Sequence, residues 1–198
     1  PLHAFTLLGG HLISNTSGGA NGMAAGSKAV DIRTGRPRKM RTNRVSGTPA
    51  VQDGVLYSAG MCVSAVDVKT GQSRWLTWLG GSGWKDPQTY QHTTHAAPLV
   101  HGGSVYVGNQ TGQFHAFDIE DGSKRWQVDV GGPVLSSAAG SGSAVYFGCD
   151  DRRVYSLDAE SGEILWTSAT GGRVVSSPCV DGGRVYIGSD DGIVYCLE

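Results

Sequence analysis

The chain has 198 residues, of which 31 are glycine and only 17% are charged, and its formal net charge is −1. A chain this close to neutrality lacks the generally basic surface of a nucleic-acid-binding protein, so we predict no nucleic-acid partner. No apolar run approaches the roughly 20 residues of a membrane-spanning helix, so we also predict no transmembrane segment.

Short runs rich in valine, tyrosine and isoleucine recur along the chain, each bounded by glycine, aspartate or serine. Such runs predict β-strands, and no long stretch has the 3.6-residue periodicity of a helix. In chain order, the runs group into four-stranded units at residues 2–41, 46–78, 95–129 and 133–168, followed by 174–198 with only three strands. We therefore expect one all-β domain of five similar units, the last incomplete.

An eleven-residue pattern closes each unit. Clear copies occupy residues 65–75, 116–126 and 156–166, a degenerate copy occupies 29–39, and a fifth begins at Cys196. The starts of these copies are 36, 51, 40 and 40 residues apart. A period near 40 residues with four short strands is typical of the antiparallel blades of a β-propeller.

Three positions of the pattern recur in every clear copy, and each has a mechanical reason. The aspartate caps the following turn by accepting backbone N–H bonds, and the glycine adopts φ > 0 where the hairpin reverses. The tryptophan covers the gap to the next blade and uses its indole N–H as a tether. The predicted structural docking residues are Asp67, Gly71, Trp75, Asp118, Gly122, Trp126, Asp158, Gly162 and Trp166.

The first unit is the least regular, because Lys39 stands where the clear copies have tryptophan. It also carries a basic run, in which seven residues between Lys28 and Arg44 are basic and only Asp31 is acidic. A solvated outer hairpin accounts for such a run. The alternative is a docking face for an acidic partner or a phosphate-bearing polymer.

The whole pattern resembles the repeat of the pyrroloquinoline-quinone (PQQ) family, and the A-x-D-x-x-T-G-x-x-x-W segment resembles that family's tryptophan-docking motif. The resemblance is good from about residue 44 onward and poor before it. It implies a propeller of seven or eight blades, so we expect the five units here to be part of a larger ring. Further sequence or another chain would then supply the remaining blades, which makes a protein partner an expectation.

The resemblance implies two main functions. PQQ-dependent dehydrogenases hold the quinone and a Ca²⁺ over the central channel, and the alcohol dehydrogenases among them carry an adjacent Cys-Cys disulfide. This sequence has no Cys-Cys pair, and no Glu or Asn matches the metal-ligand positions. We therefore predict a non-catalytic interaction or scaffold module that is bacterial and either periplasmic or extracellular. The alternatives are a fragment of a PQQ-dependent dehydrogenase that oxidises alcohols or sugars with PQQ and Ca²⁺, and a sensor or accessory domain on a larger enzyme.

One irregular feature interrupts the repeat, an insertion at residues 79–94 that lengthens one period to 51 residues. It joins an outer strand to the next inner strand, so it is expected over one face of the ring, near the channel mouth. Loops on a rigid scaffold concentrate binding residues. The candidate ligand or partner residues are Trp84, Asp86, Tyr90, His92 and His95. A packed loop that only covers the blade junction is the alternative.

Neither the histidines nor the cysteines predict a metal site. His92 and His95 form an H-x-x-H pair that lacks a third ligand, and turn capping accounts for the two Asp-Asp pairs at 150–151 and 190–191. Cys62, Cys149, Cys179 and Cys196 show no C-x-x-C spacing, so we favour buried free thiols. A Cys149–Cys179 disulfide between neighbouring blades is the alternative.

Overall fold

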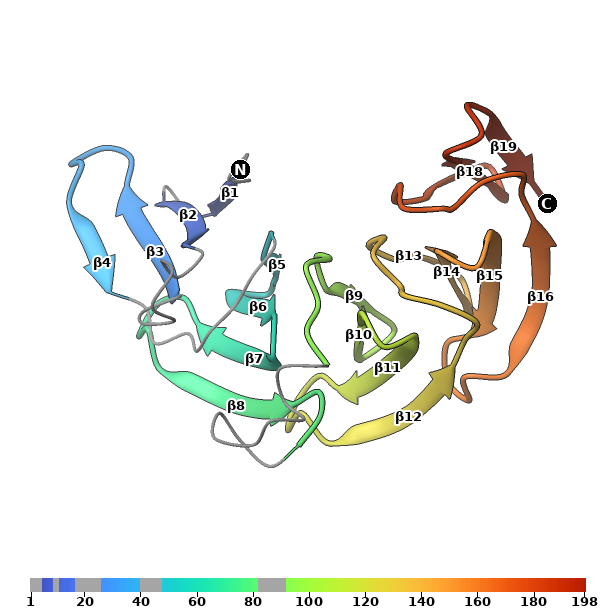
Figure 1. Cartoon of the computed structure of the whole chain (residues 1–198). Helices are drawn as coiled ribbons and strands as arrows, with labels where there is room; N and C mark the ends of the chain where they lie inside the picture. Colours follow the sequence, from blue (N-terminus) through green and yellow to red (C-terminus); the bar gives the residue numbers. More distant parts are fainter. Residues whose placement is uncertain (1–4, 9–10, 17–25, 40–47, 82–91) are drawn as a thin grey trace.

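Five antiparallel β-sheets follow one another along an arc, with the first and last sheets apart from each other (Figure 1). The computed structural model describes residues 5–8, 11–16, 26–39, 48–81 and 92–198. All regular structure in these residues is β-strand, which confirms the all-β propeller-blade architecture expected from the sequence.

The sheets are formed by strands that are consecutive in the chain, so each sheet is a simple meander. Sheet 1 contains β1 (Phe5–Leu8), β2 (His11–Thr16), β3 (Gly26–Asp31) and β4 (Pro37–Lys39). Sheet 2 contains β5 (Ala50–Gln52), β6 (Val55–Ala59), β7 (Cys62–Asp67) and β8 (Ser73–Trp78). Sheet 3 contains β9 (Leu99–His101), β10 (Ser104–Gly108), β11 (Gln113–Asp118) and β12 (Lys124–Asp129).

The last two sheets differ in their number of strands. Sheet 4 contains β13 (Ala139–Ser141), β14 (Ala144–Cys149), β15 (Arg153–Asp158) and β16 (Ile164–Ala169). Sheet 5 contains β17 (Cys179–Asp181), β18 (Arg184–Gly188) and β19 (Val194–Leu197). Sheet 5 thus has three strands, the number expected from the sequence.

The innermost strands are shorter than the sequence suggested. Strands were expected across 95–100, 136–139 and 174–180, but β9, β13 and β17 have three residues each. The preceding segments bond to neighbouring elements instead. Ser136 Oγ, for example, accepts the N–H of Gly148 at 2.9 Å and donates to its carbonyl at 2.9 Å. Because the Ser136 hydroxyl already bonds the N–H and the carbonyl of Gly148 in β14, this segment cannot form the backbone hydrogen bonds that would extend β13.

A register shift recurs at the same place in sheets 2, 3 and 4. It falls between Ala116 and Phe117 in sheet 3, and Ala116 is the partner of Trp126 in the register. The equivalent shifts in sheets 2 and 4 follow the partners of Trp75 and Trp166. A bulge locally increases the twist of a strand and re-aims its side chains. It therefore gives the three tryptophans equivalent positions on the outer strands.

The hydrophobic core lies between the sheets. Tyr57 and Val63 of sheet 2 pack against Phe117 of sheet 3 in one buried cluster. Phe114 of sheet 3 stacks on Phe147 of sheet 4 with ring centroids 4.0 Å apart. Because the middle strands of sheet 3 are buried on both faces, they are apolar on both faces, which accounts for runs such as Val-Tyr-Val.

Candidate functional site

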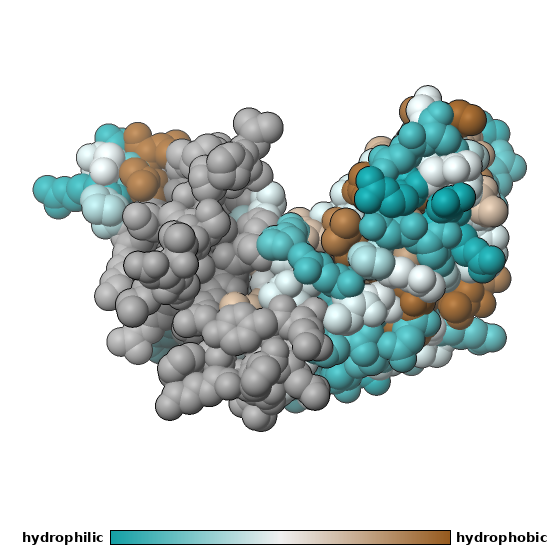
Figure 2. Space-filling model, viewed as in Figure 1, coloured by the Kyte–Doolittle hydropathy of each residue, from teal (hydrophilic) through white to brown (hydrophobic). Residues whose placement is uncertain are grey.

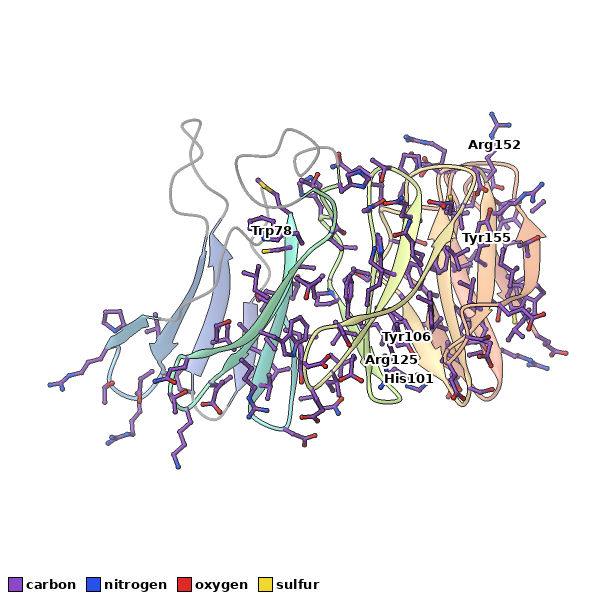
Figure 3. The ribbon with its side chains drawn as sticks, turned by 90° about the horizontal axis from the view of Figure 1, so that it is seen from below. Trp78, His101, Tyr106, Arg125, Arg152 and Tyr155 are labelled. Carbon is purple, nitrogen blue, oxygen red and sulfur yellow. The ribbon has the colours of Figure 1, made fainter. Side chains whose placement is uncertain are left out.

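The arc has two rims, which Figure 3 shows at opposite edges of the molecule. One edge carries the hairpins between second and third strands, where Arg152 is labelled, together with the links from each outer strand to the next inner strand. We call it the hairpin rim. The other edge, the turn rim, carries His101 and Arg125 beside the remaining turns. The insertion leaves β8 and returns to β9 on the hairpin rim.

The returning end of the insertion is fixed to sheet 3 by His92. Its Nδ1 lies 2.9 Å from Gln113 Oε1 and 3.1 Å from Thr111 Oγ1, both in the β10–β11 hairpin. The imidazole also packs over Gly80, where a Cβ would lie 2.3 Å from the ring. A glycine is therefore required at position 80, at the start of the insertion, so that the His92 ring at the other end can pack over it.

Backbone bonds complete this attachment. The N–H of Gln110 donates to the carbonyl of Thr93 at 3.0 Å, and the N–H of Thr94 donates to the carbonyl of Gly60 at 3.0 Å. Thr94 is buried and also caps the next turn, because its Oγ1 accepts the N–H of Ala96 at 3.1 Å. The insertion therefore ends on hairpins of both sheet 2 and sheet 3.

A buried asparagine organises the hairpin beneath His92. Asn109 Oδ1 accepts the backbone N–H of Thr111 at 3.1 Å and of Gln113 at 2.9 Å. Its Nδ2 donates to Gln113 Oε1 at 3.2 Å, which orients that amide toward His92. Asn109, Thr111 and Gln113 were not among the binding residues predicted from the sequence. Asn109 opens the N-x-T-G turn, and this turn pattern was the available signal.

His115 lies one layer deeper and is fully buried. Burial lowers its pKa to about 3, with smaller contributions from Lys124 and His92, so the ring is neutral at physiological pH. The ring stacks on Phe117 with centroids 5.8 Å apart, and within the described part of the chain its Nδ1 has no hydrogen-bond partner. It was not predicted, because a lone histidine in a strand carries no motif.

The structure describes two of the five predicted binding residues, His92 and His95. Trp84, Asp86 and Tyr90 lie outside the described residues. His92 belongs to the polar network just described, whereas His95 is exposed beyond it. Across the described residues, no three His, Cys, Asp or Glu side chains form a group that could hold a metal ion.

Arginine and tyrosine side chains engage the paired aspartates elsewhere on the hairpin rim. Arg173 Nε donates to Asp190 Oδ2 at 3.0 Å, and its guanidinium also lies 3.8 Å from Asp150 Oδ2. Tyr155 donates to Asp151 Oδ2 at 2.5 Å; burial, and then this bond, raise the tyrosine pKa to about 12. These carboxylates therefore tie hairpins and links together.

The repeated docking motif has the same local geometry in each clear copy. Asp67 Oδ1 accepts the N–H of Thr70 at 2.7 Å, a bond that holds the carboxyl pKa below its ordinary value. Asp118 and Asp158 also have lowered pKa values, caused first by Arg125 and by Ser161 respectively. The glycines of the motif all have positive φ: +73° at Gly71, +72° at Gly122 and +77° at Gly162.

Two of the three tryptophans dock on the following sheet. Trp75 Nε1 donates to the carbonyl of Ile119 at 2.9 Å, and Trp126 Nε1 donates to that of Ala159 at 3.2 Å. Trp126 also covers Gly162, where a Cβ would lie 2.7 Å from the indole. Trp166 has no acceptor for its indole N–H in the described structure. The motif geometry therefore joins sheet 2 to sheet 3 and sheet 3 to sheet 4.

These features, repeated blades with tryptophans docked across their junctions, agree with a family-level match. The family model described as outer membrane protein assembly factor BamB matches residues 24–148 and 127–198. The chain belongs to this BamB family. BamB of Escherichia coli (strain K12) is 33% identical over 93 residues, which are 44% of this chain and 23% of that protein. BamB of Xanthomonas campestris pv. campestris is 31% identical over 91 residues, which are 45% of this chain and 22% of that protein. The matched segment thus spans less than a quarter of these curated relatives.

Solved structures show the same fold over nearly the whole chain. The crystal structure of BamB from Moraxella catarrhalis matches with a TM-score of 0.76 and 20% identity, covering 98% of this chain and 60% of that one. A quinohemoprotein alcohol dehydrogenase from Pseudomonas putida HK5 matches with a TM-score of 0.72 and 17% identity, covering 97% of this chain and 39% of that one. Both likenesses show the β-propeller fold shared by BamB and PQQ-dependent enzymes.

The described residues of this BamB-family chain do not fit PQQ with Ca²⁺. Calcium requires several oxygen ligands that converge on one point. The paired aspartates of the hairpin rim bond protein groups instead: Asp190 bonds Arg173, and Asp151 bonds Tyr155. No reaction step through the quinone follows from these side chains.

The cysteines do not form the alternative disulfide. All four are free; Cys62 and Cys149 are buried, whereas Cys179 and Cys196 are exposed. Burial raises the pKa of the Cys62 and Cys149 thiols to about 12. The prediction of buried thiols was therefore wrong for Cys179 and Cys196, because both lie on the outer face of sheet 5.

Proposed function

We propose that this BamB-family propeller is a non-catalytic scaffold that binds a protein partner through its hairpin rim, and that it serves outer membrane protein assembly, as the description of its family indicates. The periplasm is the compartment that fits this role, because an assembly factor must meet outer membrane proteins before they insert. None of the described residues forms a helix long and apolar enough to cross a membrane.

The attachment of the insertion by His92 is the observation that carries this proposal. A loop that only fills a junction needs no specific polar anchor. Here the returning end of the loop is held by His92, which contacts Thr111 and Gln113 and packs over Gly80 at the start of the loop. Such contacts reduce the conformational entropy that binding of a partner must otherwise overcome, because the returning end of the insertion is already positioned on a rigid sheet.

The hairpin rim also carries an exposed charged group on sheet 4. Arg152 is exposed at the tip of the β14–β15 hairpin with φ +68°, whereas glycine occupies the equivalent positions 112 and 192. A non-glycine residue with positive φ is uncommon and costs about 1 kcal/mol. An exposed arginine kept at this cost supports a binding role for the rim, because strained residues concentrate at functional sites.

Photocrosslinking in cells tests the proposal. A photoreactive residue placed at His95 is expected to capture a protein of the outer membrane assembly pathway. The same residue placed at Glu160, exposed on the turn rim, is the matched control and is expected to capture little. Equal capture from both positions, or none from His95 or from Trp84 in the insertion, would contradict binding through the hairpin rim.

A second variant separates the anchor from the fold. His92→Ala removes the contact with the β10–β11 hairpin, and we expect capture from position 95 to fall severalfold while thermal unfolding changes little. His101→Ala is the matched control, because His101 bonds the Gly142 carbonyl on the turn rim at 2.9 Å. Unchanged capture with His92→Ala would exclude the anchored insertion as the binding element.

The dehydrogenase alternative has a direct assay. PQQ and Ca²⁺ are added to the purified protein, and dye reduction is measured with alcohols and sugars. The scaffold proposal predicts no quinone absorbance after gel filtration and no turnover. Substrate-dependent dye reduction above that of PQQ alone would replace it with the enzyme function.

A further inference from the structure

Sheet 4 departs from the docking motif at two neighbouring positions. The tenth position of the motif is arginine in the copies of sheets 1, 2 and 3, and it is leucine, Leu165, in sheet 4. The ninth position is proline, serine or lysine in those three copies, and it is isoleucine, Ile164, in sheet 4. Sheet 4 thus has a large aliphatic residue at both positions, where no other copy has one.

In sheets 2 and 3, the arginine at the tenth position pairs with the aspartate of its own motif. Arg74 Nη2 lies 3.3 Å from Asp67 Oδ2, and Arg125 Nη2 lies 2.6 Å from Asp118 Oδ2. Figure 3 shows Arg125 on the turn rim. The arginine therefore neutralises, within each copy, the carboxylate that caps the turn.

The equivalent aspartate of sheet 4, Asp158, lacks this partner. Its Oδ1 accepts the N–H of Ser161 at 2.8 Å, and this bond is the first cause of its lowered pKa, so the carboxylate is ionised at neutral pH. Among the described residues, no arginine or lysine forms an ion pair with Asp158. The replacement of arginine by Leu165 thus leaves a charge without the partner that the motif supplies elsewhere.

The two aliphatic side chains face solvent. Ile164 is 43% exposed and Leu165 is 50% exposed, and Figure 2 shows hydrophobic residues on the outer wall of the arc near β16. Sheet 4 packs against sheet 3 on one side and sheet 5 on the other. The equivalent Arg125 side chain of sheet 3 is 37% exposed with sheets on both sides. The tenth position is therefore solvent-facing in a blade that has both neighbours, and Leu165 is an apolar residue at such a position.

The outer edge of β16 is suited to strand pairing. No strand of the described structure pairs with this edge. Sheets ordinarily place charged residues on edge strands, which prevents pairing with other chains. The outer strand β12 carries Lys124, Arg125 and Asp129, whereas β16 reads Ile-Leu-Trp-Thr-Ser-Ala and has no charged residue. The backbone N–H and C=O groups of this edge are thus open to an extended chain.

We propose that an extended segment of a partner protein adds to the outer edge of β16, with an arginine that pairs with Asp158 and apolar side chains that cover Ile164 and Leu165. The partner's arginine takes the place that Arg125 has beside Asp118 in sheet 3. In strand addition of this kind, the main-chain bonds provide affinity and the side chains provide specificity. The surface is separate from the hairpin rim, so the proposal does not depend on binding there.

Charge favours a basic occupant. The motif copy at 156–166 contains three acidic residues and no basic one, whereas the copy at 116–126 contains three acidic and two basic residues. The outer wall of sheet 4 therefore attracts a cationic segment more strongly than that of sheet 3 does.

Peptide binding tests the proposal directly. The probe is a fluorescent peptide of about eight residues, a common strand length, with alternating valine and threonine and one central arginine. Its matched control carries citrulline, which has nearly the same shape without the charge. One strand buries less than the roughly 1,200 Å² of a standard interface, so half-saturation is expected between roughly 0.1 and 1 mM. Fluorescence anisotropy at low salt is expected to show binding roughly threefold to fivefold tighter for the arginine peptide.

Leu165→Arg is the main variant. It supplies an internal partner for Asp158 and puts a charge on the edge, so the affinity for the arginine peptide is expected to fall roughly tenfold. Its thermal unfolding should match that of the unmodified chain, because three other copies carry arginine at this position. Ser141→Arg adds the same charge at an exposed position of the inner strand β13, and it should bind the peptide like the unmodified chain.

Asp158→Asn isolates the ion pair. The asparagine Oδ1 still accepts the N–H of Ser161, so the turn keeps its cap. The variant is expected to bind the arginine and citrulline peptides equally, at the affinity that the unmodified chain has for the citrulline peptide.

A second site built into sheet 3 separates binding from a structural role. The double variant Lys124→Ile with Arg125→Leu reproduces the two aliphatic residues of sheet 4 and leaves Asp118 without its arginine. It is expected to bind two peptides per chain, whereas the unmodified chain binds one. Deuterium exchange of β16 amides should slow when the peptide binds the unmodified chain.

Several results would overturn the proposal. Binding of neither peptide up to about 1 mM, equal affinity for the two peptides, or full binding by Leu165→Arg would each do so. One peptide per chain in the double variant would also contradict it. Leu165→Arg should leave crosslinking from position 95 unchanged, so a failure here is distinguishable from a failure of binding through the hairpin rim. Because the contact is weak, it adds little to the capture from position 160.

Discussion

The junction between sheets 3 and 4 and the outer end of sheet 5 have nearly the same sequence pattern but opposite environments. In the junction, Phe114 is stacked and fully buried, and Trp126 has its acceptor. At the outer end, Val194 is 73% exposed; at the intervening junction between sheets 4 and 5, Trp166 has no acceptor within the described residues. The repeat therefore specifies which surfaces are able to pair, and the neighbouring sheet decides whether they are buried.

This contrast implies that stability is distributed between neighbours. In repeat proteins, stability is approximately a sum of terms for each repeat and for each interface. Among the described residues, sheet 4 has two interfaces, with sheets 3 and 5, whereas sheet 5 has one, with sheet 4. Substitutions at a junction with intact contacts on both sides should therefore lower the free energy of unfolding more than equivalent substitutions at a junction where such contacts are missing. The difference should equal the contribution of the lost interface contacts.

Tryptophan removal should show the largest difference. Trp126→Ala loses ring contacts with Tyr106 and Phe114, at centroid distances of 5.7 and 6.1 Å, and the bond to Ala159. We expect a loss of about 3 kcal/mol in the free energy of unfolding for Trp126→Ala, and roughly 1 kcal/mol for Trp166→Ala. Urea unfolding followed by circular dichroism measures both. Equal losses would contradict the role assigned to the docked indole.

Glycine substitution should give the next largest effect. Gly162 has φ +77° and lies under Trp126, whereas Gly142 has φ +58° and open space around it. Alanine adds backbone strain of about 1 kcal/mol at both sites, and it also collides with the indole at Gly162. Thermal unfolding should therefore show a loss of about 2–3 kcal/mol for Gly162→Ala and about 1 kcal/mol for Gly142→Ala. If both variants melted together, the indole would not be seated on Gly162.

Mild acid should destabilise the protein through His115. Its folded pKa of about 3 lies below the ordinary 6.5, so below pH 6.5 the unfolded chain binds a proton that the folded chain does not. The free energy of unfolding should therefore fall as the pH falls from 6.5 to about 4.5, above the range where aspartates titrate. His115→Gln cannot be protonated and should be flatter in this window. If the free energy of unfolding depended on pH equally in both proteins, a group other than His115 would be the one that titrates.

The smallest effect is expected at Arg152. Its φ of +68° is one that glycine adopts without strain, and the equivalent Gly112 and Gly192 have φ +80° and +84°. Arg152→Gly should raise the free energy of unfolding by about 0.5 kcal/mol. If Arg152 serves partner binding, the same variant should lower crosslinking from position 95. Destabilisation in a urea titration would show that the arginine makes contacts which outweigh the strain.

The parts of the fold that could be predicted are those encoded locally and repeated. Each eleven-residue motif specifies its own turn, because Asp118 and Gly122 act within five residues of each other. Three copies in register were therefore enough to predict the four-stranded units and the three strands of sheet 5. The short inner strands were not predictable in the same way. Hydroxyls such as that of Ser136 bond Gly148, twelve residues away, instead of allowing the strand to extend.

The candidate site was predicted less completely, for a physical reason. His92 could be selected from its place in the insertion. Its partners Thr111 and Gln113 are brought to it only by the return of the chain onto sheet 3. The exposure of Cys196 likewise depends on the absence of a sheet over it among the described residues, which no local pattern encodes.

Hydrogen exchange of the monomeric chain, measured at low concentration, tests most directly whether each sheet depends on its neighbours. In the part of the chain that the structure describes, the strands β14 and β15 have a sheet on both faces, whereas β18 and β19 have one on a single face. We predict that amides of β18 and β19 exchange roughly tenfold or more faster than the equivalent amides of β14 and β15. Equal protection of the two pairs would contradict the account, because sheet 5 would then be as stable without a second neighbour as sheet 4 is with one.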